Sequence, residues 1–123
     1  MRIFLFIGTG SFIGGVSRYY ISKLLQESIF FTLPIGTFTV NIVGSFLIGF
    51  FFGLSEKTVV DPEWRLLLTT GFCGSFTTFS TFANENLTYL RDGQFMHFIS
   101  YTTLSMLFGL VAVYLGRIIV KLV

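Results

Sequence analysis

Uncharged, mostly apolar runs divide the chain into four long segments. They cover residues 3–17, 28–55, 66–84 and 98–116. A membrane-spanning helix needs about 20 mainly apolar residues, a length that the last three runs reach or nearly reach. The first run is shorter, but the long side chain of Arg18 can extend to the membrane surface while its helix continues. The pattern therefore predicts an all-α membrane protein, a single transmembrane domain over residues 1–123 with helices at 3–25, 34–54, 65–89 and 95–121.

The connections between these predicted helices are short. They occupy residues 26–33, 56–63 and 90–94, too few to hold a soluble catalytic domain. Pro34 suits a first helical turn, and Trp64 with Arg65 suits a membrane interface. Because the number of crossings is even, we expect both chain ends on one side of the membrane.

Basic residues are nearly balanced between the two predicted sides. The side of the chain ends holds Arg2, Lys57, Arg65, Arg117 and Lys121, and the other side holds Arg18, Lys23 and Arg91. Since the Lys and Arg distribution sets membrane orientation, this weak bias permits insertion in both directions. A small but sufficient preference for one orientation explains the counts equally well.

Composition agrees with a membrane protein and argues against other classes. Hydrophobic residues make up 53% of the chain and charged residues 11%, against about 25% charged in soluble domains. The single cysteine, Cys73, excludes an intramolecular disulfide and any multi-cysteine metal site. A net charge of +2 gives no reason to expect nucleic acid as a partner. No nucleophile–base or metal-ligand constellation indicates an enzyme.

Polar side chains inside the predicted helices need partners, because hydrocarbon offers none. Thr37, Asn41 and Ser45 recur every four residues and therefore share one helix face. Asn41 lies in mid-span and carries both donors and an acceptor. An interhelical hydrogen bond explains this residue as well as a role in binding does.

A carboxylate within or near the bilayer, here Glu85, is a candidate functional group. A position near the helix end, reaching water or Arg91, explains it equally well. Small residues at Gly10 and Gly14, and at Gly49 and Gly53, predict close helix packing. Four helices of this length leave several polar faces toward lipid, so we expect at least a dimer.

Residues 71–82 read GFCGSFTTFSTF and combine glycines, hydroxyl residues and phenylalanines. Glycine is a poor helix former, and Ser and Thr can bond backbone groups, so the helix can break here. A continuous helix with its Ser and Thr bonded to its own carbonyls fits the local sequence equally well. Carbonyls freed by a break can hold a cation. Phenylalanine ring edges are electropositive and can face a small anion, although most of the phenylalanines must face lipid or core.

Three motifs together resemble the Fluc/CrcB family of small fluoride channels over essentially the whole chain. They are GxxxGGVSRY at residues 10–19, GTFTVNIVGSFLIG at 36–49 and GFCGSFTTFSTF at 71–82. The resemblance implies an antiparallel, dual-topology homodimer in the cell membrane that exports fluoride passively through two pores. It also implies a central Na⁺ held by the backbone carbonyls of Gly74 and Thr77 from both subunits.

The same resemblance assigns a fluoride pathway. Phe79 and Phe82 would present ring edges to fluoride and Asn41 would donate near them, with Arg18 at the vestibule and Glu85 along the path. Ser80 and Thr81 lie at the break, and Tyr101 and Ser105 belong to a polar track of the last helix. Gly109 and Val113 do not continue that track, so its outer part is in doubt in this chain.

Three other functions are considered: an antiporter, a proton-coupled transporter and a membrane scaffold. A small multidrug-type antiporter also has four short helices, but it needs an acid in its first helix, and none precedes Glu27. A proton-coupled fluoride or small-solute transporter could use Glu85. A membrane scaffold explains the glycines, but gives no reason for Asn41, Glu85 and the hydroxyl residues around a glycine break.

Overall fold

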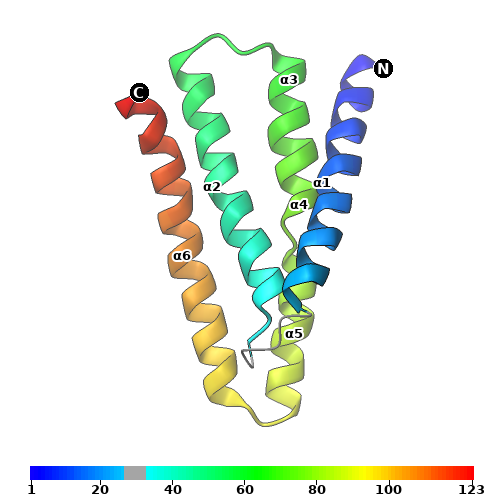
Figure 1. Ribbon diagram of the computed structural model, residues 1–123, viewed down its shortest axis with the longest axis vertical. Coiled ribbons are helices and arrows are strands. Elements are labelled where there is room, and N and C mark those ends of the chain that lie inside the picture. The colour runs from blue at the N-terminus through cyan, green and yellow to red at the C-terminus, as the bar shows by residue number, and fades with distance from the viewer. Residues whose placement is uncertain (27–32) are drawn as a thin grey trace.

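All regular structure in the described residues, 1–26 and 33–123 of a computed structural model, is helical (Figure 1). The three long helices are α1 (Arg2–Gln26), α2 (Ile35–Lys57) and α6 (Phe95–Leu122). Between α2 and α6 follow α3 (Pro62–Leu66), the π-helix η1 (Leu67–Cys73), α4 (Gly74–Phe76) and α5 (Phe79–Arg91). The expectation of an all-α fold is confirmed. Most of the predicted connection at 26–33 lies outside the described residues.

The long helices run along the length of the molecule, and both chain ends lie at the end that carries the α2–α3 connection (Figure 1). Among the described residues, α2 and α6 are long and apolar enough to cross a membrane. Helix α1 has 25 residues, but its glycine, hydroxyl and basic residues make it less apolar. The fold therefore has two helices that could cross a membrane, packed with two more polar segments.

The connection between α2 and α3 is shorter than the predicted 56–63, because α3 begins at Pro62. Asp61 caps this helix, with its Oδ1 accepting a hydrogen bond from the Glu63 N–H at 3.0 Å. Pro62 occupies the first helical position, where the missing N–H costs nothing. Asp followed by Pro is a helix-start signal that the charge pattern concealed.

Helix α1 packs closely along η1, and two glycines permit that approach. A Cβ on Gly10 would lie 2.2 Å from the Leu67 carbonyl oxygen, and one on Gly14 would lie 2.3 Å from the Phe72 carbonyl oxygen. The prediction that these small residues allow close packing is confirmed. The backbone of η1, rather than a flexible side chain, fills the space in front of both glycines.

We expect Gly14→Ala to destabilise the fold by about 1–3 kcal/mol, because the added methyl group meets backbone that cannot move aside cheaply. Gly15→Ala is the matched control, since a Cβ on Gly15 meets nothing within 4 Å. Trp64 packs edge-on against Phe6 of α1 at 5.5 Å, so its fluorescence can follow denaturant unfolding in detergent. Equal stability of the two variants would contradict the packing that we describe.

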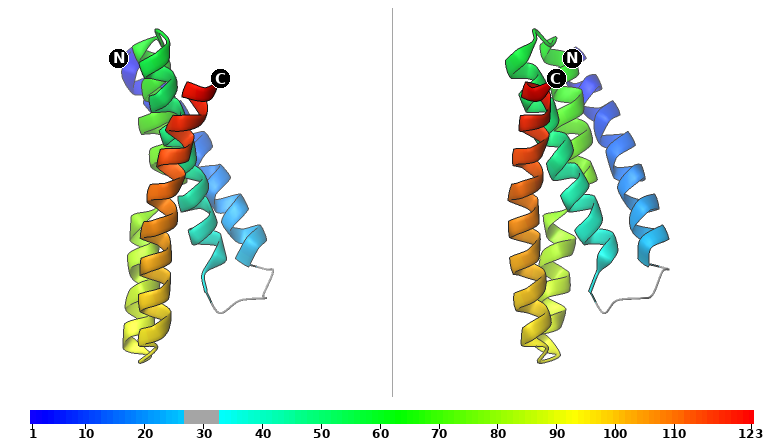
Figure 2. Two further views of the ribbon diagram at one scale, coloured as in Figure 1. Left: turned by 90° about the vertical axis from the view of Figure 1, so that its left-hand side faces the viewer. Right: turned by 60° about the vertical axis from the view of Figure 1, so that its left-hand side comes forward.

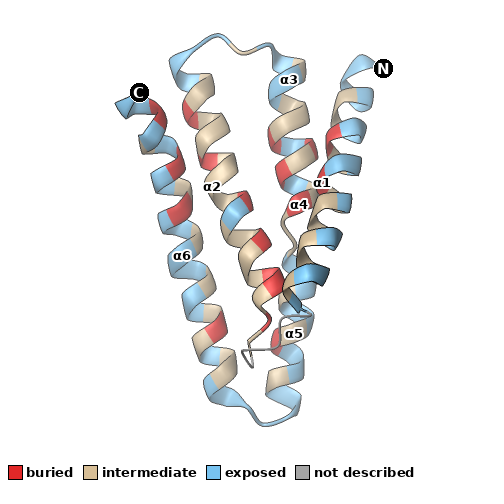
Figure 3. Cartoon of the chain, in the orientation of Figure 1, coloured by how far each residue is buried: buried red, intermediate tan, exposed pale blue. Residues whose placement is uncertain are grey.

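Helices α2 and α6 form the most extensive helix pair, again through glycines. A Cβ on Gly49 would lie 2.2 Å from the Val113 carbonyl oxygen, and one on Gly116 would lie 2.2 Å from the Phe46 carbonyl oxygen. The facing surfaces carry buried residues, whereas most of the outer surface of α6 is exposed (Figure 3). Exposed apolar side chains of α6, such as Leu110 at 66% exposure, suit contact with lipid or with a second chain.

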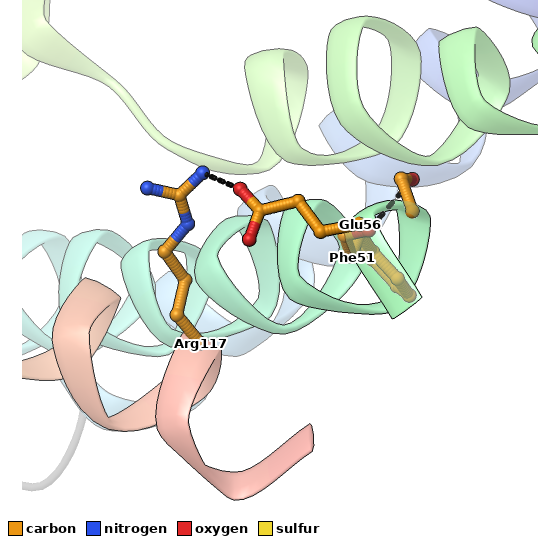
Figure 4. Close-up of polar contacts among 4 residues, drawn as sticks. Phe51, Glu56 and Arg117 are labelled. Atoms are coloured by element: carbon orange, nitrogen blue, oxygen red, sulfur yellow. Dashed lines mark hydrogen bonds and ion pairs between the residues drawn. The ribbon is translucent and has the colours of Figure 1, made fainter. Parts of the chain in front are cut away.

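Ion pairs join helices at the end of the molecule that carries both chain ends. Arg117 of α6 pairs with Glu56 of α2 (Figure 4), and Arg2 of α1 pairs with Glu63 of α3 at 3.0 Å. Such exposed pairs contribute about 0–1 kcal/mol each. At the opposite end, the α5–α6 hairpin leans away from α1 and the start of α2 (Figure 2).

Candidate functional site

The helical ladder stops at Phe76 and restarts at Phe79, between α4 and α5 (Figure 1). Thr77 and Thr78 have extended backbone, with φ and ψ of −87° and 157° and of −145° and 112°. Thr78 begins α5 as its N-cap, and its Oγ1 accepts a hydrogen bond from the Thr81 N–H at 3.3 Å. A π-helix, of the kind often found at functional sites, precedes this interruption.

Asn41 of α2 bonds both backbone groups of Thr78. Its Oδ1 accepts from the Thr78 N–H at 2.7 Å, and its Nδ2 donates to the Thr78 carbonyl oxygen at 3.2 Å. One amide side chain thus replaces partners that a continuous helix would supply to this residue. An amide nitrogen carries two N–H groups, so one remains for a further acceptor.

The carbonyls of Gly74 and Thr77 lose their usual helical partners at the interruption. The Thr78 N–H, which would bond Gly74 in a continuous helix, is taken by Asn41. The Thr81 N–H, which would bond Thr77, is taken by the Thr78 hydroxyl. Carbonyl oxygens are hard donors that suit hard cations such as Na⁺, so these two groups fit the predicted ligand set chemically.

Arg18 of α1 holds the other side of the interruption. Its Nε donates to the carbonyl oxygen of Ser75 at 3.0 Å. Irregular backbone at membrane depth requires such partners, because lipid cannot satisfy it. Side chains from α1 and α2 therefore stabilise the same short segment from two directions.

A groove of about 420 Å³ opens beside the interruption. Six of the predicted residues line it: Asn41, Gly74, Thr77, Phe79, Phe82 and Ser105. The Ser105 hydroxyl is buried there without a hydrogen-bond partner in the described part of the chain. The groove thus combines two phenylalanine rings, an amide and a hydroxyl with mostly apolar walls.

The two phenylalanines of this groove differ in their surroundings. Phe79 is 79% exposed, and its ring centroid lies 6.0 Å from that of Phe82. Phe82 also contacts Tyr101, at 5.0 Å between centroids. Phe82 therefore packs against Tyr101 of α6, whereas the Phe79 side chain is exposed on the surface of the single chain.

A second groove, of about 490 Å³, lies between α1, α2 and α5 and contains Arg18, Thr81 and Glu85. Both oxygens of the Glu85 carboxylate are hydrogen-bonded, Oε2 by the Thr37 hydroxyl and Oε1 by the Tyr101 hydroxyl, each at 3.2 Å. Thr78 lines both grooves. Both grooves therefore border the interruption.

The remaining predicted residues lie beside the grooves. Ser80 is exposed on α5, with its Oγ 3.4 Å from that of Thr78, and Tyr101 is buried behind Phe82 with 1% exposure. Sequence reasoning did not assign Thr37 and Thr78 to the site. The four-residue spacing of Thr37 from Asn41 signals the first, and the helix-cap position before Phe79 signals the second.

These features define a small helical membrane protein whose polar interior groups gather around one helix interruption. The sequence profile of the family described as "CrcB-like protein, Camphor Resistance (CrcB)" matches residues 5–117. The chain therefore belongs to the CrcB family, as its motifs predict.

Curated relatives extend over nearly the full chain and are named fluoride-specific ion channel FluC. One from Chlorobium phaeobacteroides is 46% identical over 120 residues, covering 97% of this chain and 92% of its own. One from Bacteroides fragilis is 48% identical over 117 residues, covering 93% and 91%. One from Aquifex aeolicus is 40% identical over 120 residues, covering 97% of each. These names describe ion channels, in agreement with the expectation that the chain is not an enzyme.

Proposed function

We propose that this protein is a fluoride-selective ion channel that lets fluoride leave the cell passively and so prevents its toxic accumulation. The observation that carries this proposal is the groove at the helix interruption, where Asn41, Phe82 and Ser105 converge in a chain of the CrcB family. Fluoride is strongly hydrated, so a selective path must replace its water with other donors. Binding must also stay weak enough for the ion to leave.

The donors along the proposed path are of three kinds. Phe79 and Phe82 present the electropositive edges of their rings. Asn41 offers its remaining amide N–H, and Ser105 offers its buried hydroxyl. Toward the second groove, Thr81 continues the hydroxyl lining with Ser80 next to it on α5, Arg18 attracts the anion, and Glu85 with Tyr101 borders the path.

The functional unit is an antiparallel homodimer of four-helix subunits, inserted with dual topology in the cell membrane and surrounded by lipid. The exposure of Phe79 supports this assembly, because a ring that binds an anion needs a dry surrounding that one chain does not supply. The nearly balanced basic residues support insertion in both orientations. In this arrangement the interruption between α4 and α5 lies at mid-membrane depth.

The backbone carbonyl oxygens of Gly74 and Thr77 from both subunits would hold a Na⁺ ion at the dimer centre, which would balance their partial negative charges. We expect replacement of Na⁺ by N-methylglucamine in all buffers, through purification and reconstitution, to lower fluoride efflux at least about tenfold, since four buried dipoles would lose their cation. Returning Na⁺ should restore the rate, and fluoride-electrode recordings measure both. Efflux that is indifferent to Na⁺ would contradict this part of the proposal.

A proton-coupled carrier is the second candidate, because Glu85 lies in the groove that holds Arg18. Liposomes loaded with potassium fluoride, with valinomycin setting the voltage and equal pH on both sides, separate the two. The channel releases fluoride, as measured by an electrode, without a matching change in internal pyranine fluorescence. Fluoride efflux accompanied by stoichiometric proton movement would favour the carrier, and absence of fluoride efflux would reject both.

A further inference from the structure

Four side chains of α5 and α6 interlock between the second groove and the tip of the hairpin. Glu85 and Tyr89 lie one turn apart on α5, and His97 and Tyr101 lie one turn apart on α6, so each pair shares a helix face. The hairpin that joins the two helices turns at Gly93, whose φ of 73° suits glycine. The chain reversal brings the two pairs together.

Tyr89 is inserted between the two rings of α6. It stacks on His97, with centroids 5.5 Å apart and planes 23° apart. It meets Tyr101 nearly at right angles, at 6.3 Å and 80°. Both are favourable geometries for aromatic pairs.

Tyr101 is consequently enclosed on two sides. Phe82 contacts its ring at 5.0 Å, and Tyr89 contacts it from the hairpin side. Its hydroxyl donates to Glu85 Oε1 at 3.2 Å, and only 1% of the residue is exposed. The direction of that hydroxyl therefore depends on how the two neighbouring rings hold the phenol.

We propose that Tyr89 is a positioning residue of the fluoride path: its ring holds Tyr101 so that the Tyr101 hydroxyl stays on Glu85. This inference rests on the proposed channel function. Without the Tyr89 ring, Tyr101 gains space toward the hairpin and its hydroxyl leaves the carboxylate. The Glu85 charge is then less compensated beside the path and repels an entering anion.

The test compares Tyr89→Leu with Tyr89→Phe in reconstituted liposomes, over a range of fluoride concentrations. Removal of the ring should slow efflux about three- to tenfold at low fluoride and less at saturating fluoride, in line with the strength of one aromatic pair. Retention of the ring in Tyr89→Phe should keep the rate within about twofold of the unaltered protein. Tyr114→Leu is the matched control, because Tyr114 is an exposed tyrosine of α6, and its efflux should be unchanged.

The same change is then made in a Tyr101→Phe background, where no phenol hydroxyl is left to position. There Tyr89→Leu should have little further effect, because the two residues act on one contact. If Tyr89→Leu does not yield a dimer, His97→Leu removes the outer ring of the stack and should give a smaller loss that also disappears in that background.

Three results would overturn the inference: unaltered efflux in Tyr89→Leu, equal losses in Tyr89→Leu and Tyr89→Phe, or an undiminished loss in the Tyr101→Phe background. Failure of the unaltered protein to release fluoride would instead reject the proposed function. The two failures are therefore distinguishable in one set of recordings.

Discussion

Replacing Phe82 with Ile is expected to reduce fluoride efflux to the leak of protein-free liposomes, and Phe79→Ile is expected to do the same. Isoleucine keeps an apolar side chain in the groove but has no electropositive ring edge to replace water around the anion. Phe82 would also lose its contact with Tyr101 at 5.0 Å, so the inner wall of the groove would shift. The measurement is efflux recorded with a fluoride electrode from liposomes that contain equal amounts of protein.

The control for the two phenylalanine substitutions is Phe4→Ile. Phe4 is 73% exposed in the single chain, close to the 79% of Phe79. Phe4 lies outside both grooves, so its replacement should leave efflux unchanged. Size-exclusion chromatography of each variant establishes that assembly is retained. Wild-type efflux from either Phe79→Ile or Phe82→Ile would remove the ring-edge mechanism.

Asn41→Asp is expected to reduce fluoride efflux about as strongly as the two phenylalanine substitutions do, for two reasons that act together. An aspartate can accept the Thr78 N–H but cannot donate to the Thr78 carbonyl oxygen, which Asn41 bonds at 3.2 Å. It also places a negative charge in the groove that the anion must cross. We therefore expect fluoride efflux to fall at least about a hundredfold, because a buried charge close to the path costs several kcal/mol.

Asn41→Ala separates the two reasons, since it removes both hydrogen bonds without adding charge. Leaving the Thr78 N–H without a partner should lower the free energy of unfolding by about 1–3 kcal/mol. Ser55→Ala is the control on the same helix, because the Ser55 hydroxyl donates within α2 to the Phe51 carbonyl oxygen at 2.9 Å. If Asn41→Asp conducted at the normal rate, the role that we give Asn41 would be untenable.

Much of the helical architecture follows from the charge pattern, because charged residues concentrate where helices end. The glycine pairs also predicted close packing correctly: Gly10, Gly14 and Gly49 each face backbone of a neighbouring helix. The π-helix η1 was not predictable from the sequence. Tertiary packing, rather than local propensity, decides whether a segment forms a π-helix or an α-helix. The start of α3 carried a local signal, Asp61 followed by Pro62, that the uncharged-run criterion overlooked.

For the site, periodicity predicts which residues share a face but not what they meet. The four-residue spacing shows that Thr37 and Asn41 share a helix face. Their hydrogen-bond partners, Glu85 and Thr78, are 48 and 37 residues further along the chain, so spacing could not identify them. Local sequence left a continuous helix and an interruption at residues 71–82 equally open. The bond from Asn41 to the Thr78 backbone is the tertiary contact that distinguishes the two, and no local pattern contains it.

Side-by-side recording of fluoride and chloride efflux from the same reconstituted liposomes tests whether this protein is a fluoride-selective channel. Valinomycin makes the liposome membrane permeable to potassium, and ion-selective electrodes record each anion. We expect fluoride to be released while chloride efflux stays at the leak of protein-free liposomes. Equal rates for the two anions would contradict it.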